Sequence, residues 1–261
     1  YYFRERDKTG DSKDRYRDFS GGLKANYDFN IMSNLEVAYT FDQYDKSDYL
    51  TSYKYDVRDY SNVQHSVRAL YNYTFNDKNI LTVGGDYMRD YLLSYQFTNN
   101  GSYTMHSADA FGQFDWNPTE HFNVISGVRF DYFSQSNVRH ISPHIGLMYK
   151  IANCSLRSSY SQGFRSPTLK EMYNPDLKSE TSHNFSLSAE YTKNRYNFTV
   201  SGYYNLVNDR IDLTSFRDTD GRWAQLYINT EKVDIAGVDI NASAKYPCGL
   251  GIRVSYGYLH E

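Results

Sequence analysis

The sequence predicts an all-β fold, an antiparallel transmembrane β-barrel with about twelve strands in these 261 residues. Apolar and polar residues alternate with a period of two along most of the chain, which places the apolar residues of each strand on one face. Many of these runs exceed the about 5 to 6 residues of an ordinary globular strand. Aromatic residues make up 17% of the chain, although the mean hydropathy is only −0.72. Both values are typical of a sheet with one face in lipid and the other in water.

The alternation defines the expected strands in order. The apolar runs span 23–29, 35–41, 63–75, 81–87, 110–116, 121–133, 145–149, 156–160, 184–191, 196–204, 233–246 and 252–258. In the run 233–246 the apolar residues change from odd positions, Val233 and Ile235, to even positions, beginning at Val238. Because a slip of one residue turns a strand's apolar set to the other face, we expect a β-bulge at Ala236 and Gly237.

The connections between the expected strands alternate in size. Short turns are expected near 30–33, 76–78, 117–120, 152–153, 193–194 and 247–249. Longer polar connections are expected at 48–58, 95–103, 163–180 and 215–222, with 135–137 as a short exception. Tight turns at one rim and longer connections at the other are typical of a barrel whose short turns face the periplasm. Several strands end at the short-turn rim with an aromatic residue, as an interfacial girdle requires: Phe29, Phe75, Trp116, Tyr149 and Tyr246.

Charge and composition exclude several other classes of protein. The net charge of −3 and the pI near 6.2 provide no basic field, so no nucleic-acid partner is expected. No window approaches the about 18 apolar residues that a membrane helix needs. Cys154 and Cys248 have no CxxC spacing, so we expect two free or buried thiols and no zinc site. A soluble β-sandwich or propeller remains an alternative, which would stay in solution without detergent.

The segment Gly163–Glu180 is the most informative part of the chain. Taken alone it is a long polar loop, because Pro167 and Pro175 cannot donate to a strand ladder. It contains FRSPTLKEMY followed by NPDLKSE and an alternating strand, and YINTEKVDIAGVDINASAKY follows at Tyr227–Tyr246. These motifs resemble the barrel of the TonB-dependent outer-membrane receptors, in which an FRxP-like box precedes an NPxLxxE box and a barrel strand.

The resemblance implies that residues 1–261 are a partial TonB-dependent receptor β-barrel domain. They would form part of a 22-stranded barrel, with the plug domain and the terminal strands outside this sequence. Such a receptor contacts outer-membrane lipid, binds a small-molecule nutrient chelate and takes it up with energy from the TonB complex, which acts through the plug. Neither enzymatic activity nor a cofactor is implied.

A ferric siderophore is the expected nutrient, with cobalamin or haem next. The haem-receptor branch of the family places a histidine between the two boxes, and Thr168–Tyr173 contains none. A passive porin or an outer-membrane barrel enzyme remains the alternative function. No catalytic residue and no metal site is predicted from the sequence, and the histidines, His106 and His140 among them, are interpreted as ordinary polar residues.

Aromatic and guanidinium side chains on the outer side of the strands are the candidates for ligand binding. They suit an aryl, macrocyclic or anionic ferric chelate through stacking and charge. The candidates are Tyr53, Arg58, Tyr95, Tyr103, Arg165, Tyr173, Arg222 and Trp223.

Overall fold

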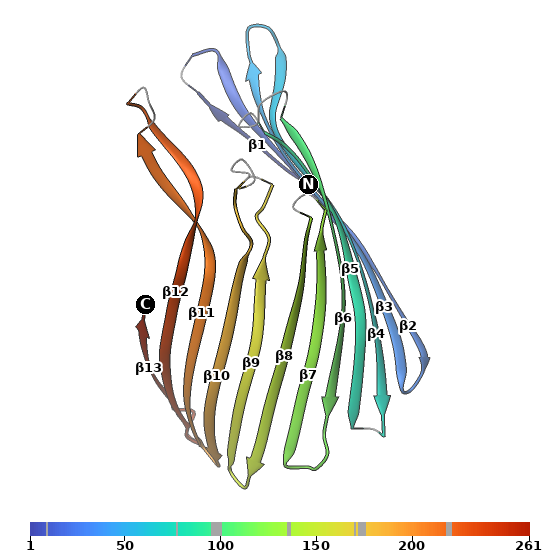
Figure 1. The fold of residues 1–261 in the computed structure, drawn as a ribbon, viewed down its shortest axis with the longest axis vertical. Helices are drawn as coiled ribbons and strands as arrows, with labels where there is room; N and C mark the ends of the chain where they lie inside the picture. The colour runs from blue at the N-terminus through green and yellow to red at the C-terminus, as the bar shows by residue number, and fades with distance from the viewer. Residues whose placement is uncertain are drawn as a thin grey trace.

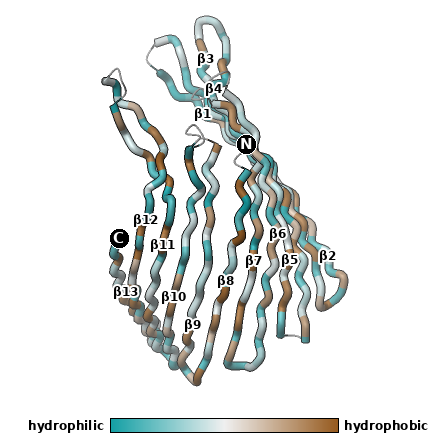
Figure 2. The backbone as a smooth tube through the Cα atoms, in the orientation of Figure 1, coloured by the Kyte–Doolittle hydropathy of each residue, from teal (hydrophilic) through white to brown (hydrophobic). Residues whose placement is uncertain are grey.

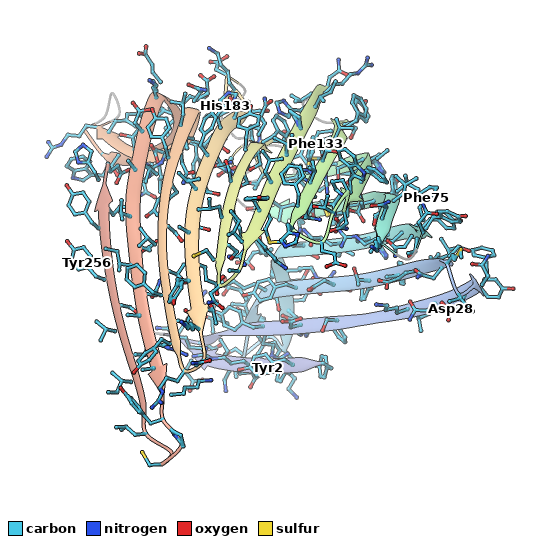
Figure 3. The ribbon with its side chains drawn as sticks, turned by 90° about the horizontal axis from the view of Figure 1, so that it is seen from below. Tyr2, Asp28, Phe75, Phe133, His183 and Tyr256 are labelled. Carbon is cyan, nitrogen blue, oxygen red and sulfur yellow. The ribbon has the colours of Figure 1, made fainter. Side chains whose placement is uncertain are left out.

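The computed structural model describes residues 1–8, 10–76, 78–94, 101–134, 137–169, 171, 176–217 and 221–261. They form one antiparallel sheet in which every strand pairs with its neighbours in sequence (Figure 1). The strands are β1 (Tyr2–Asp7), β2 (Ser12–Asn30), β3 (Ser33–Leu50), β4 (Tyr55–Phe75), β5 (Asn79–Ser94), β6 (Ser102–Trp116), β7 (Phe122–Phe133), β8 (Val138–Ile151), β9 (Cys154–Arg165), β10 (Glu180–Lys193), β11 (Tyr196–Arg217), β12 (Trp223–Lys245) and β13 (Gly251–His260). The sheet is partial, with β1 and β13 as its edges, and it is strongly curved (Figure 3).

Each of the twelve expected runs corresponds to a strand, with only His121 and Tyr246 just outside β7 and β12, and β1 is the additional strand. The sequence of β1 is mostly charged, so no apolar alternation marks it. Ion pairs hold it to β2 instead: Glu5 lies opposite Arg15 in the register, and the Arg15 Nε donates to Glu5 Oε1 at 2.7 Å. Among the described residues, no helix is long and apolar enough to cross a membrane.

The short turns lie at the expected rim. The connections 31–32, 152–153 and 194–195 each contain two residues. Asn76, Ala152 and Asn194 adopt positive φ angles of 50°, 48° and 52°, the left-handed conformation that tight turns need. Cys154 and Cys248 lie near this rim, where both thiols are free and exposed; free or buried thiols were expected.

The outer connections are shorter than expected, because the strands continue beyond the apolar pattern. The predicted connection 48–58 is only the turn 51–54, and β11 runs on to Arg217. The extensions of β2, β3 and β4 rise together above the neighbouring strands (Figure 1). Both faces of such an extension meet water, so alternation is no longer required and polar residues continue the strand.

The predicted bulge at Ala236 and Gly237 is wrong. Both residues keep an uninterrupted register with β11 and with β13. An added Cβ at Gly237 would meet the ring of Tyr203, which lies directly opposite it. The apolar pattern changes phase because Val238 and the apolar residues after it lie on the lipid-facing side, whereas Val233 and Ile235 occupy alternate positions on the opposite face. The register shifts instead between Lys46 and Ser47, in the pairing of β3 with β4, and between Asp28 and Asn30, in that of β2 with β3.

A soluble protein buries its apolar side chains, whereas in this sheet the apolar side chains are exposed and the polar ones are shielded. From Ile141 to Tyr149 on β8, the exposed positions are apolar, with Ile141 59% exposed, and the shielded positions between them include Ser142 and His144. Leu187 on β10 is 62% exposed. Figure 2 shows the alternation of hydrophobic and hydrophilic residues along the strands. An apolar face that stays exposed along many strands is the lipid-facing side of a barrel.

The opposite face, here called the polar face, carries ion pairs where a lumen belongs. Arg68 binds Asp86 through Nε at 2.6 Å, and Arg129 binds Asp109 and Asp131 at 2.9 and 2.8 Å. Among the described residues, this face carries a small hydrophobic cluster of Leu92, Met105 and Leu169, packed against Tyr60, Met88 and Phe133.

We predict that Leu187→Arg prevents assembly in lipid. Leu187 lies midway between His183 and Tyr191 on the exposed apolar face, so an arginine there costs about 2–4 kcal/mol in the bilayer. Thr199→Arg is the matched control, since Thr199 lies on the polar face opposite Glu190. Heat-modifiable electrophoretic mobility after folding into vesicles measures the yield. Equal yields for the two variants would contradict the assignment of the faces.

Candidate ligand-binding mouth

The outer end of the polar face brings together two of the predicted ligand residues. Tyr103 on β6 lies opposite Leu92 of β5, beside the small apolar cluster. Arg165 ends β9 and lies opposite Glu180, the first residue of β10. Trp223 begins β12 at a neighbouring outer tip, where its side chain is 72% exposed and the guanidinium carbon of Arg217 lies 5.1 Å from its ring centre. This end of the sheet therefore offers aromatic surfaces and a cation.

The other predicted ligand residues are placed differently. Arg58 pairs in register with Ser47 beyond the register shift, on the side of the sheet that continues the lipid-facing face. Its Nη2 lies 3.3 Å from Oδ2 of Asp45, so it points away from the polar face. Tyr53 is exposed in the turn 51–54, and Arg222 is exposed in the connection before β12. Tyr95 and Tyr173 lie outside the described residues.

Arg165 is held by two carboxylates of the protein itself. Its Nη1 donates to both oxygens of Glu171, at 3.0 and 2.9 Å, and its Nη2 donates to Glu180 Oε1 at 2.7 Å. Glu180 Oε1 also accepts the backbone N–H of Ile211 at 2.7 Å. The hydrogen bond from Arg165 outweighs partial burial and lowers the pKa of Glu180, while the hydrogen bond to Glu180 raises the pKa of Arg165. These contacts tie the end of β9 and the start of β10 to Ile211 within β11.

Glu171 extends this anchor into the loop that follows β9. Its Oε2 accepts the backbone N–H of Thr168 at 2.8 Å and the Thr168 hydroxyl at 3.0 Å. This arrangement turns the chain back, and Leu169 enters the polar face with only 2% of its surface exposed. It packs in the cluster with Leu92 and Met105, from β5 and β6. The described part of the loop is therefore folded over the mouth of the sheet.

The anchoring roles of Leu169, Glu171 and Glu180 were not predicted from the sequence. A usable signal was present, because Thr168 and Glu171 have the spacing of a capping box, in which a hydroxyl residue and a glutamate three positions later bond each other's backbone. No sequence signal marks the approach of Leu169 to β5 and β6, since these strands are distant along the chain.

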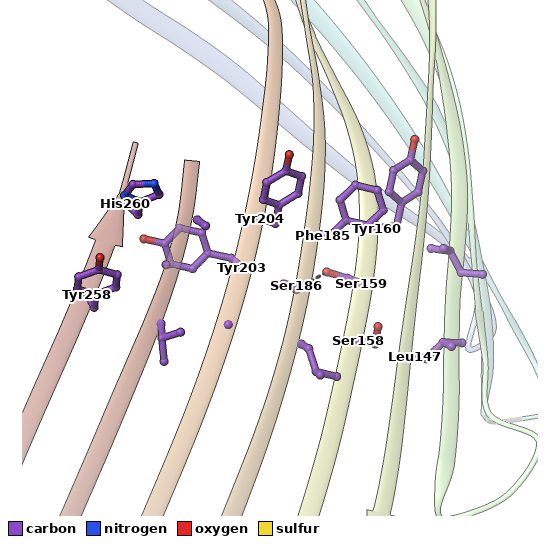
Figure 4. A pocket seen from close by; sticks show the side chains of 16 residues that line it. Leu147, Ser158, Ser159, Tyr160, Phe185, Ser186, Tyr203, Tyr204, Tyr258 and His260 are labelled. Carbon is purple, nitrogen blue, oxygen red and sulfur yellow. Dashed lines mark hydrogen bonds between the residues drawn. The ribbon is translucent and has the colours of Figure 1, made fainter. Parts of the chain in front are cut away.

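An apolar hollow lies elsewhere, on the lipid-facing side of β8–β13. It has a volume of about 650 Å³. Small residues, Ser158, Gly202 and Ala236 among them, form its floor, and larger side chains such as Tyr160, Phe185 and Tyr204 surround it (Figure 4). Because the hollow opens toward lipid, it is no candidate for capturing a water-soluble nutrient. No group of three or more potential metal ligands occurs among the described residues.

Three structural neighbours share this sheet at low sequence identity. They are the siderophore receptor PirA from Pseudomonas aeruginosa (TM-score 0.83, 13% identity), the copper transporter OprC (0.72, 16%) and the FrpB iron transporter from Neisseria meningitidis (0.71, 12%). Each match covers 95% of this chain, but only 50%, 47% and 43% of the neighbour. The chain therefore spans about half the length of the solved proteins that it resembles.

The family comparison covers the whole chain. The model of the TonB-dependent receptor-like β-barrel matches residues 1–261. This match agrees with the curved antiparallel sheet, its exposed apolar face and its short turns at one rim. The chain belongs to the family of TonB-dependent receptor β-barrels, which are proteins of the outer membrane.

Proposed function

We propose that the full protein is an outer-membrane receptor that binds a scarce nutrient as a small-molecule chelate, a ferric siderophore first, and imports it with energy from TonB. The observation that carries the proposal is the loop after β9, whose described residues 166–169 and 171 are anchored over the polar mouth of a receptor barrel by Arg165, Glu171 and Leu169. The three neighbours named above are a siderophore receptor, a copper transporter and an iron transporter. A metal-containing nutrient is the cargo class that their names have in common.

The side chains at the mouth favour an aromatic or anionic chelate. Tyr103 lies opposite Leu92, which packs against Leu169 of the anchored loop, and the guanidinium of Arg217 lies against the ring of Trp223. An aryl group stacks on such rings, and a carboxylate or catecholate oxygen accepts from a guanidinium. Arg165 acts differently in this proposal, since Glu171 and Glu180 already engage both of its terminal nitrogens. It positions the loop, and the loop positions the surface that meets the ligand.

The decisive experiment uses the full-length protein in cells. Uptake of radiolabelled iron is measured with ferric siderophores of the catecholate and hydroxamate types, in cells with and without TonB. Saturable uptake that disappears without TonB is the expected result. Uptake that persists without TonB would favour a passive porin. In parallel binding assays, tighter binding of haem, cobalamin or free copper than of any ferric siderophore would overturn the choice of nutrient.

Arg165→Ala and Glu180→Gln should weaken siderophore binding by similar factors, about tenfold, because each removes charge-assisted hydrogen bonds of the same anchor. Tyr103→Ala should weaken binding without releasing the loop, and protease sensitivity of the loop separates the two effects. If Arg165→Ala weakened binding far more than Glu180→Gln, with the loop still protected, direct contact of Arg165 with the ligand would replace the anchoring role.

The anchor should also respond to acid. The pKa of Glu180 is lowered in the folded protein from its usual value of 4.5, so its ion pair contributes fully above that value. The contribution is lost as the pH falls through the lower, folded pKa. We therefore expect the loop of the wild type to become protease-sensitive only below about pH 4.5, whereas the loop of Glu180→Gln is sensitive at neutral pH. A wild-type loop that opened between pH 6 and 7 would point to another titrating group.

A further inference from the structure

Three tyrosine–histidine pairs of the same geometry lie on the lipid-facing side, toward the outer ends of the strands. In each pair the tyrosine hydroxyl contacts the histidine Nδ1 on the next strand, and the two rings lie nearly parallel. The pairs are Tyr39–His65 at 2.8 Å, Tyr87–His106 at 2.7 Å and Tyr160–His183 at 3.0 Å, with interplanar angles of 27°, 27° and 16°. The register places another residue directly opposite each tyrosine. The histidine follows that residue on the same face of the same strand, one step closer to the outer end.

The pairing determines how a neutral histidine presents its other nitrogen. When the tyrosine hydroxyl donates to Nδ1, the ring proton must reside on Nε2, which is then a hydrogen-bond donor. Within the described part of the chain, the Nε2 atoms of His65, His106 and His183 have no hydrogen-bond partner. Each pair therefore holds one N–H donor in a fixed orientation on the outside of the barrel.

Arg89 lies between two of these histidines. The register places His65 of β4 opposite Arg89 of β5, and Arg89 opposite His106 of β6. Side chains in such a row are about 5 Å apart from strand to strand. Arg89 is exposed and has no carboxylate, hydrogen-bond or aromatic partner among the described residues.

The neighbouring rows on this face contain no acidic residue. The row directly inward is Tyr39, Val67, Tyr87, Ala108 and Tyr132. The row directly outward is Gln43, Val63, Tyr91 and Thr104. His65, Arg89 and His106 thus form a donor row with a positive charge, bordered inward by apolar and aromatic side chains. An arginine without a counterion at a lipid boundary is costly unless an anion from outside the protein pairs with it.

The height of the donor row matches the outer boundary of the bilayer. His65 is ten residues from the girdle aromatic Phe75 on β4, and His106 is ten residues from Trp116 on β6. Ten residues extend about 34 Å along a strand, or about 26 Å along the axis of a barrel whose strands tilt by about 40°. The apolar band of outer-membrane barrels is about 25 Å tall. The donor row therefore lies where lipid headgroups begin.

We infer that His65, Arg89 and His106 form a binding site for the phosphate of an outer-leaflet lipid, on the outside of the barrel and separate from the nutrient site. Arg89 pairs with the phosphate oxygens, and the two Nε2–H groups donate to the same headgroup from either side. The acyl chains lie inward along Tyr39, Val67, Tyr87 and Ala108. This apolar continuation is why a lipid, rather than a free anion, is the occupant.

The test uses the full-length protein in dodecyl maltoside micelles, with native mass spectrometry after addition of lipid A in its diphosphorylated or its dephosphorylated form. We expect the diphosphorylated form to bind more tightly, and Arg89→Gln to weaken its binding by about tenfold. The double variant His65→Phe, His106→Phe should weaken it as well. Arg195→Gln, which removes an exposed arginine at the opposite rim, should leave binding unchanged.

Three results would overturn the inference. They are equal binding of the two lipid forms, unchanged binding in Arg89→Gln, and displacement of the lipid by inorganic phosphate at equal concentration, which would assign the site to a free anion. Heat-modifiable mobility identifies folded protein for each variant. Arg89→Lys is the second variant at this position, and binding to it should fall between those of the wild type and Arg89→Gln, because the charge remains without the planar fork.

Discussion

The hydrogen-bonded ladder between strands is the constraint on which the rest of the structure depends. In the hydrocarbon layer no water is available to the backbone, so each N–H and C=O must bond to a neighbouring strand. The register accordingly runs without interruption through the lipid-facing parts of the strands, and every connection leads to the adjacent strand. An uninterrupted register also fixes the two faces, because successive side chains point to opposite sides. The exposed Leu187 and the shielded Ser188 follow from this single rule.

Outside the bilayer the same strands are held by different interactions. Asp45 on β3 is 1% exposed and accepts the Ser61 hydroxyl at 2.6 Å and the Gln43 amide at 2.9 Å. Arg17 pairs with Asp56, which links β2 to β4 across β3. Exposed ion pairs contribute little individually, but a buried and fully bonded carboxylate such as Asp45 is costly to leave without partners. Such polar contacts, rather than lipid, define the tall extension of β2–β4.

This difference explains how far the sequence could predict the fold. The runs of alternating residues and the short turns were predicted correctly, since bilayer physics imposes a period of two. The extensions and β1 were not, because in water a strand needs no apolar face. The continuous register at Gly237 was missed because Val233 and Ile235 are apolar residues on the face opposite the lipid-facing side. The outward direction of Arg58 had no sequence signal for the same reason: the register shift between Lys46 and Ser47 lies in the extension, where no apolar pattern reveals a change of phase.

In the candidate site, the motif residues have a structural role that the motif itself does not reveal. Arg165 belongs to the FRSP motif and Glu180 to the NPDLKSE motif, and the two side chains bind each other where β9 and β10 begin to part around the loop. Motif residues that join two strands and a loop are required whatever ligand is carried, so they identify the family without identifying the nutrient. On the proposed function, selectivity comes from side chains outside the motifs. Tyr103 and Trp223 meet that condition, because both lie outside the two motifs and present aromatic surface at the outer end of the sheet.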